Sequence, residues 1–194
     1  LLHAVSVGEV NAIRALVTDL TNQGYEIVVS VTTDTGLLRA DELYGAQHTV
    51  TRFPLDYGFS VRAFLKRIRP NIIALVELEV WPNFIGISAT KNIPLIVVNG
   101  RLSERSYKRY ARANFFLRKT FSRLTAIGMQ TQEYAQRVEN LGGKNVTVEG
   151  TMKWDNVLLS KTVDGAKELA NSLGIDTNKK LIVAGSTTPQ EHAL

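Results

Sequence analysis

The sequence alternates short apolar runs with longer stretches in which apolar residues recur every three or four positions. Short apolar runs are typical of buried strands, and the longer spacing is typical of amphipathic helices. Strands are predicted at 2–7, 26–31, 72–76, 95–98, 124–129, 146–149 and 181–184, with a weaker run at 49–52. Helical spacing is clearest at 12–21, 61–68 and 133–141.

This alternation predicts the fold class. Strands that alternate with helices form parallel sheets covered on both faces, so we expect an α/β protein with a doubly wound, Rossmann-like sheet. Six strand–helix units are complete by about residue 150, which is enough for one such domain. A helix over 163–174, ended by Gly174, follows. We therefore expect one domain over 1–155, and a linker with the start of a second domain over 156–194.

Composition narrows the class of protein. The 194 residues are 44% hydrophobic and 21% charged, as in ordinary globular proteins. The absence of cysteine excludes a disulfide framework and a thiolate metal site. No apolar run approaches the roughly 20 residues that span a bilayer. Because the sequence opens inside a predicted strand, without Met, and stops soon after another, we expect it to be a piece of a longer protein.

The positive charge is concentrated in one segment. Residues 101–123 contain eight Lys and Arg residues against Glu104 alone, within a chain of net charge +5. This concentration predicts a negatively charged partner. A helix from the N-cap Ser103 to Phe121 would mix these cations with aromatic residues, which suits an anionic membrane surface or phosphorylated lipid headgroups. A solvated helix with a buried aromatic stripe is the alternative, and no nucleic-acid-binding motif accompanies the patch. The candidate contact residues are Arg101, Arg105, Arg109 and Arg112.

The turns after the strands are where ligands bind in open parallel sheets. The first turn, residues 6–11, lacks the GxGxxG pattern, so we predict no dinucleotide cofactor. Glu9 follows Gly8 at the start of a predicted helix. It either complements the helix dipole, which is worth about 0.3–1 kcal/mol, or acts as a general base at the mouth of the sheet.

Two further turns carry charged residues. Glu77 and Glu79 follow the strand at 72–76 and would point to the same side if that strand continued through them. A salt bridge to a basic loop explains them without a metal, and we expect no metal because no His or Asp cluster accompanies them. Lys153 lies between Gly150 and Trp154, where it either meets a phosphate or developing anion, or is an ordinary surface residue.

Six strings along the chain together resemble the 3-deoxy-D-manno-octulosonic acid (Kdo) transferase family. They occur in the family's order and with similar spacing over nearly the whole chain. The strings are HAVSVGEVNA at 3–12, TTDTG at 32–36, ELEVWPN at 77–83, NGRLSERS at 99–106, GTMKWD at 150–155 and GST at 185–187. Thr151, Trp154 and Thr188 depart from the family's usual residues, so no donor contact is assigned to the segment after Thr187.

The resemblance implies a GT-B glycosyltransferase whose first Rossmann-like domain binds the acceptor and whose second binds CMP-Kdo. It implies inverting transfer of Kdo to a lipid A precursor in lipopolysaccharide inner-core synthesis, at the cytoplasmic face of the bacterial inner membrane. It also implies an anchoring segment before residue 1 and no cofactor. Glu9 matches the family's catalytic base, and Glu79 and Lys153 match positions of transition-state stabilisation. We expect the isolated chain to be inactive, because most of the donor domain follows residue 194.

Two other functions remain open from the sequence. One is another GT-B enzyme that uses a different sugar nucleotide. The other is a non-catalytic α/β domain that binds membranes or nucleic acid through its basic helix. Glu9 distinguishes an enzyme from a binding module, since a binding module does not need a carboxylate at the mouth of the sheet.

Overall fold

A computed structural model describes residues 1–156, 165–176 and 179–180, and the statements below concern these residues. The chain divides into two compact units, Leu1–Val157 and Leu158–Leu194. In the second unit, helix α9 covers Ala166–Ser172, and Gly174 just beyond it adopts the left-handed φ of 64° that suits a helix end. The strand predicted at 181–184 and the turn at 185–187 lie outside the described residues.

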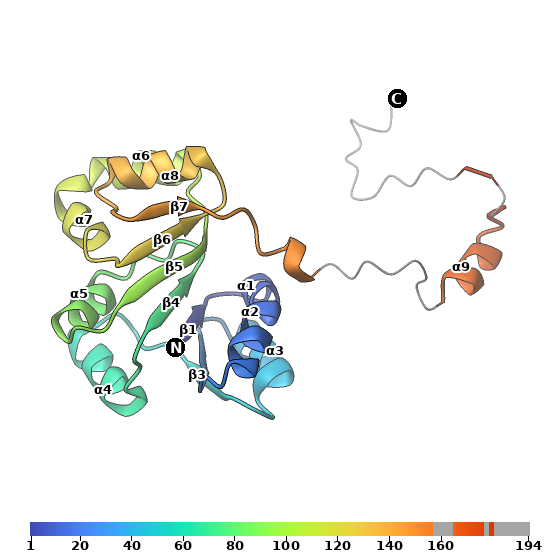
Figure 1. The fold of residues 1–194 in the computed structure, drawn as a ribbon, viewed down its shortest axis with the longest axis horizontal. Coiled ribbons are helices and arrows are strands. Elements are labelled where there is room, and N and C mark those ends of the chain that lie inside the picture. Colours follow the sequence, from blue (N-terminus) through green and yellow to red (C-terminus); the bar gives the residue numbers. More distant parts are fainter. Residues whose placement is uncertain (157–164, 177–178, 181–194) are drawn as a thin grey trace. The chain divides into compact units, whose positions relative to one another are not determined.

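The first unit is built on a sheet of seven parallel strands (Figure 1). The strand order is β3-β2-β1-β4-β5-β6-β7, so the chain winds outward in both directions from the pair β1 and β4. The strands are β1 (Leu2–Ala4), β2 (Val28–Val31), β3 (Thr49–Arg52), β4 (Ile73–Val76), β5 (Leu95–Gly100), β6 (Ala126–Met129) and β7 (Val146–Val148).

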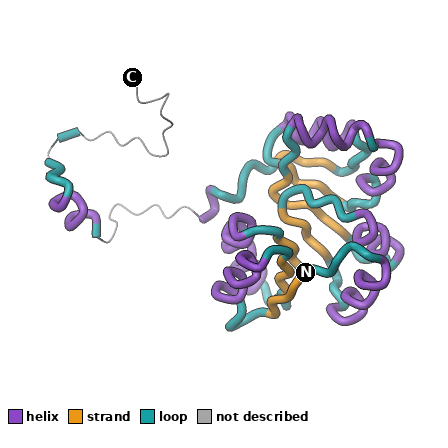
Figure 2. The backbone as a smooth tube through the Cα atoms, turned by 180° about the vertical axis from the view of Figure 1, so that it is seen from behind, coloured by secondary structure: helices purple, strands orange, loops and turns teal. Residues whose placement is uncertain are grey.

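Helices cover both faces of this sheet (Figures 1 and 2). Along β4, Ile73 and Leu75 belong to one buried cluster and Ala74 and Val76 to another, as alternation along a strand requires. Helices α4, α5, α7 and α8 contribute to the first cluster, and α1, α2 and α3 to the second. The helices are α1 (Val7–Ala12), α2 (Arg14–Asn22), α3 (Asp34–Tyr44), α4 (Gly58–Ile68), α5 (Pro82–Thr90), α6 (Glu104–Arg112), α7 (Asn114–Phe121) and α8 (Gln132–Asn140), with the short 3₁₀ helix η1 at Trp154–Asn156.

The doubly wound parallel sheet predicted from the sequence is confirmed, including the weak strand at 49–52. The predicted strand over 2–7 is shorter than expected. It ends at Ala4 because the Val5 amide donates to the Glu9 carboxylate, which starts the chain into α1. The helix predicted over 12–21 is confirmed as α2, which begins at Arg14, and the separate short helix α1 precedes it, with Ile13 between them.

The single helix predicted from Ser103 to Phe121 is also wrong. Ser103 caps α6 as expected, since its hydroxyl accepts the Ser106 amide at 3.3 Å. The helix then breaks at Ala113, whose amide bonds to the Tyr110 carbonyl three residues back. The break allows α7 to bury Phe121 in the core, whereas α6 buries no residue completely.

Candidate active site

The carboxyl ends of β1 and β4 form the point where the strand order reverses. Ligands of open α/β sheets bind in the crevice at this point, since the connections leave in opposite directions there. Glu9 follows β1, while Glu77 and Glu79 follow β4. The fold therefore brings Glu9 to Glu77 and Glu79, which lie about 70 positions later in the sequence.

Glu9 lies in the first turn of α1 with only 8% of its surface exposed. One carboxylate oxygen accepts the Val5 amide at 2.7 Å, and the other accepts the Ser6 hydroxyl at 3.0 Å. Burial raises the pKa of Glu9 above its usual value, and the Glu77 charge adds to this, while the bonds from Val5 and Ser6 oppose it. Each carboxylate oxygen has a further lone pair, so this buried and oriented carboxylate can still accept a proton.

The turn that carries Glu9 is held by the start of α3. The Thr33 hydroxyl donates to the Val5 carbonyl at 2.9 Å and accepts the Gly36 amide at 3.2 Å. A Cβ on Gly36 would lie 2.7 Å from Val31 Cγ1 and 3.3 Å from the Ser6 carbonyl carbon. The glycine thus permits close approach of α3 to this turn, and both polar backbone groups of Val5 are fixed.

Glu77 ends β4 in an unusual backbone conformation. Its φ is 57°, in the left-handed region, although it is not a glycine, and its amide donates to the Val98 carbonyl at 2.9 Å. The strand stops at Val76, so the expectation that Glu77 and Glu79 would alternate along a continued strand does not apply. Strained backbone of this kind concentrates at functional sites, which is consistent with a site at the end of β4.

Glu79 is half-buried, and the negative charges of Glu9 and Glu77 both act on its carboxyl group. Burial, followed by the charges of Glu9 and Glu77, raises the pKa of Glu79 to about 7. Among the described residues no ion pair joins Glu79 to Arg101 or Arg105, so the structure does not provide the salt bridge considered from the sequence. In that same part of the chain, no group of three or more His, Cys, Asp or Glu side chains is arranged to hold a metal ion.

Asn99 links the ends of three strands and was not singled out from the sequence. Its side chain is 3% exposed and its φ is 56°. Its amide oxygen accepts the Gln130 side-chain amide at 3.0 Å and the Met152 backbone amide at 3.1 Å. Gln130 also donates to the Asn99 carbonyl at 3.1 Å, which fixes the orientation of both side-chain amides. A polar residue at the end of an apolar strand was the signal that could have identified Asn99.

This link determines where the Lys153 backbone lies. Met152 packs against the second core cluster, and Lys153 follows it with an exposed side chain. The structure therefore positions Lys153 near the carboxyl end of β5. No described ion pair joins its ammonium group to Glu9, Glu77 or Glu79.

The predicted basic contact surface lies on α6. Arg105, Arg109 and Arg112 line one shallow hollow, together with Ser106 and Lys108, and Arg101 is exposed just before the helix. Lys108 pairs with Glu104 at 2.6 Å, which partly neutralises the first turn. Within the part of the chain that the structure describes, none of the helices has the length and apolar character needed to cross a membrane.

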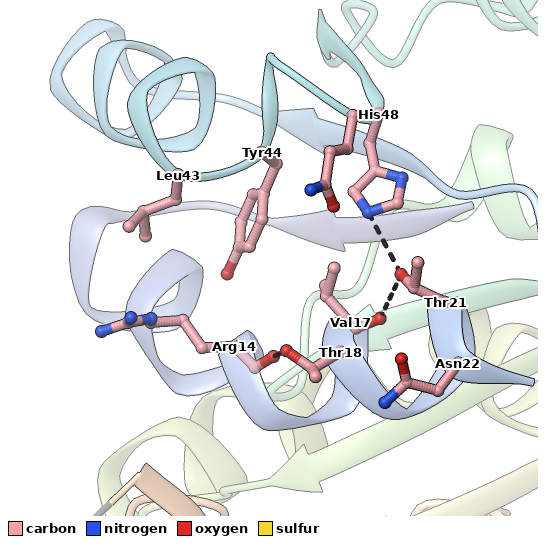
Figure 3. Close-up of a pocket in the computed structure, with 9 residues that line it drawn as sticks. Arg14, Val17, Thr18, Thr21, Asn22, Leu43, Tyr44 and His48 are labelled. Carbon is pink, nitrogen blue, oxygen red and sulfur yellow. Dashed lines mark hydrogen bonds between the residues drawn. The ribbon is translucent and has the colours of Figure 1, made fainter.

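A separate cavity of about 210 Å³ lies between α2 and the segment that joins α3 to β3 (Figure 3). In it, the Thr21 hydroxyl donates to the Val17 carbonyl at 2.6 Å and lies 3.1 Å from His48 Nε2. Because the single hydroxyl proton goes to Val17, His48 Nε2 donates to Thr21. The residues that line this cavity include none of the predicted site residues.

Comparison with known proteins identifies relatives of this chain. Residues 1–156 match the family described as 3-deoxy-D-manno-octulosonic-acid transferase (kdotransferase). A bifunctional glycosyltransferase/methyltransferase of Fusobacterium nucleatum is 36% identical over 98% of this chain and 30% of its own length. The 3-deoxy-D-manno-octulosonic acid transferases of Bordetella pertussis and Haemophilus influenzae are 30% and 31% identical, over 100% and 87% of this chain.

The chain spans less than half of these relatives, 45% of the Bordetella protein and 41% of the Haemophilus protein. Among solved structures, a putative UDP-N-acetylglucosamine 2-epimerase from Listeria monocytogenes superimposes with a TM-score of 0.60. That match covers 87% of this chain and 49% of the epimerase, at 11% sequence identity. At this identity the likeness concerns the fold alone.

Proposed function

We propose, from the premise that the chain belongs to the 3-deoxy-D-manno-octulosonic acid transferase family, that it is the acceptor-binding part of a Kdo transferase. The reaction is inverting transfer of Kdo from CMP-Kdo to a lipid A precursor, at the cytoplasmic face of the inner membrane. In this proposal residues 1–155 form the acceptor domain of a GT-B enzyme, and the donor domain begins within 156–194. The observation that carries it is Glu9, a buried carboxylate oriented by two hydrogen bonds at the strand-order reversal.

Glu9 is suited to act as the general base. As the acceptor hydroxyl oxygen bonds to the anomeric carbon of Kdo, the bond from that carbon to the CMP phosphate breaks on the opposite face. The hydroxyl proton passes to Glu9, whose raised pKa makes it a stronger base than an ordinary glutamate. CMP leaves as a stable phosphate, so the reaction does not demand a strong general acid.

Glu79 and Lys153 have supporting roles in this proposal. An ionised Glu79 beside Glu9 and Glu77 would stabilise the positive charge that develops on the anomeric carbon. Lys153 would offset negative charge on the donor carboxylate or phosphate. The exposed cations Arg101, Arg105, Arg109 and Arg112 would bind the phosphates of the acceptor or the anionic membrane surface that contains it.

The test is Kdo transfer from CMP-Kdo to a lipid A precursor by the full-length parent protein and its Glu9→Gln variant. Glutamine preserves the shape of the side chain but cannot accept the proton, so we expect turnover to fall by about 10²-fold or more. Glu42→Gln, at an exposed glutamate on α3, is the matched control. Equal rates for wild type and Glu9→Gln would remove Glu9 as the base, and no Kdo transfer by the wild type would reject the reaction.

A further inference from the structure

A cluster of exposed apolar side chains follows β3. Leu55, Tyr57 and Phe59 are 71%, 60% and 73% exposed, and they fall within five consecutive residues. We call these three side chains the apolar knuckle. Tyr57 and Phe59 stack with their rings parallel to within 4° and their centroids 6.1 Å apart. Scattered exposed apolar residues are ordinary, but three large ones within five consecutive residues, two of them stacked on each other, favour an interaction surface.

The knuckle is held in place by polar contacts beneath it. The Asp56 carboxylate accepts the amides of Asn83 and Phe84, at 3.1 and 2.7 Å, at the start of α5. The Asn83 side chain donates to the Asp56 carbonyl at 2.6 Å. Trp81, the N-cap residue of α5, makes no capping bond of its own, so Asp56 provides the acceptor that the helix start requires.

The same segment turns one aromatic side chain inward. Phe53 is buried and stacks on His3 with ring centroids 3.8 Å apart. It also packs against Trp81, with ring centroids 5.5 Å apart. The contacts of Phe53 and Asp56 hold the loop so that Leu55 and Tyr57 stay at the surface, and Phe59 lies exposed in the first turn of α4. Their exposure is therefore built into the fold.

We propose that the apolar knuckle inserts into the interfacial region of a lipid bilayer. Phenylalanine and leucine suit the boundary of the acyl chains, and tyrosine suits the level of the headgroups. The charges around the knuckle agree with this partner. The Asp56 carboxylate is occupied by α5, whereas the Arg62 guanidinium lies against Gly58, and Lys66 and Arg67 are exposed further along α4.

The inference rests on the proposed function in one respect, namely that the acceptor is a membrane lipid. Asp56 binds the amides of Asn83 and Phe84, four and five residues beyond Glu79, so insertion of the knuckle would bring the carboxyl end of β4 toward the membrane surface. The knuckle and the α6 cations would bind a membrane through different forces. Attraction of α6 to anionic lipid is screened by salt, whereas burial of apolar side chains is not.

The experiment measures flotation of the 194-residue chain with neutral phosphatidylcholine vesicles in about 0.5 M NaCl, where exposed charges are largely screened. We expect the wild type to bind, and the Leu55→Ser/Phe59→Ser variant to bind at least about tenfold more weakly. Leu38→Ser is the matched control, because Leu38 is 73% exposed but lies on α3 outside the knuckle. Both variants should keep the wild-type thermal unfolding midpoint and low-salt binding to anionic vesicles.

A second measurement locates the inserted residue directly. Phe59→Trp fluorescence should be quenched by lipids brominated in their acyl chains, and Leu38→Trp fluorescence should not. Equal flotation of the wild type and the double variant, or an unquenched Phe59→Trp, would overturn the proposal. The same double substitution in the full-length parent protein should not lower its unfolding midpoint when lipid is absent. A lower midpoint would also overturn the proposal, because it would show that another part of that protein covers the knuckle. These outcomes are independent of whether the parent protein transfers Kdo.

Discussion

Replacing Glu79 with glutamine removes the carboxyl group whose pKa is raised to about 7 by burial and by the charges of Glu9 and Glu77. In the unfolded chain Glu79 ionises with its usual pKa of 4.5, and in the folded chain with a pKa of about 7. Below pH 4.5 both states are protonated, so the residue does not oppose folding. Between pH 4.5 and 7 the unfolded chain releases this proton while the folded chain retains it, and stability falls as the pH rises. Above pH 7 the full penalty is present.

The magnitude follows from the same two values. A carboxyl whose pKa rises from 4.5 to about 7 destabilises the folded state by about 3 kcal/mol once it is ionised. Because Glu79 is only half-buried, solvent screens part of this energy, and we expect about 1–2 kcal/mol. Glu79→Gln should therefore be more stable than the wild type by about 1–2 kcal/mol at pH 8, with the difference vanishing near pH 4.

The assay is urea unfolding of the 194-residue chain followed by circular dichroism at pH 4, 6 and 8. Glu139→Gln, at an exposed glutamate on α8, should retain the wild-type pH dependence. If the free energy of unfolding of Glu79→Gln changes with pH in the same way as that of the wild type from pH 4 to pH 8, the Glu79 carboxyl does not lie in the buried, negatively charged environment described above.

Three other perturbations test separate parts of the structure. Asn99→Gly keeps the left-handed backbone but removes the acceptor of two hydrogen bonds, so it should lower the free energy of unfolding by about 1–3 kcal/mol and speed hydrogen exchange of the Met152 amide. The control is Asn92→Gly, at an exposed left-handed asparagine, and unchanged exchange in Asn99→Gly would contradict the bond from Met152 to Asn99. Gly36→Ala should destabilise the chain by about 1–3 kcal/mol, measured by urea unfolding, because its Cβ meets Val31 at 2.7 Å, and an unchanged midpoint would show that α3 can move away. Arg109→Glu/Arg112→Glu should lower sedimentation with anionic vesicles in low salt to the level that neutral vesicles give, whereas Lys144→Glu should not, and equal loss for both would indicate that only net charge matters.

Local sequence signals predicted much of the fold and one part of the site. The apolar runs located the strands, and Ser103 was correctly predicted as a helix cap because its partner is only three residues away. Glu9 was correctly expected at a helix start, since a glycine and an acidic residue directly after a strand are a local pattern. Each of these features depends on residues close together in the chain.

The features that escaped prediction depend on distant residues. Asn99 is bonded to Gln130 and Met152, which are 31 and 53 positions away, and nothing near Asn99 in the sequence signals those partners. The left-handed turn at Glu77 is supported by the Val98 carbonyl on the neighbouring strand. The break at Ala113 arises because α7 must bury Phe121, which the continuous pattern of basic and aromatic residues concealed.

The arrangement of the three carboxylates is itself an argument that the site is functional. Burial and mutual repulsion raise the pKa of Glu9 and of Glu79, so each carboxylate weakens the fold when it ionises. Among the described ion pairs none compensates them. If the acidic residues were present for stability, Glu79→Gln would destabilise the chain. If they are present for chemistry, the same substitution should stabilise the chain and slow transfer by the parent protein, and these opposite signs separate the two explanations.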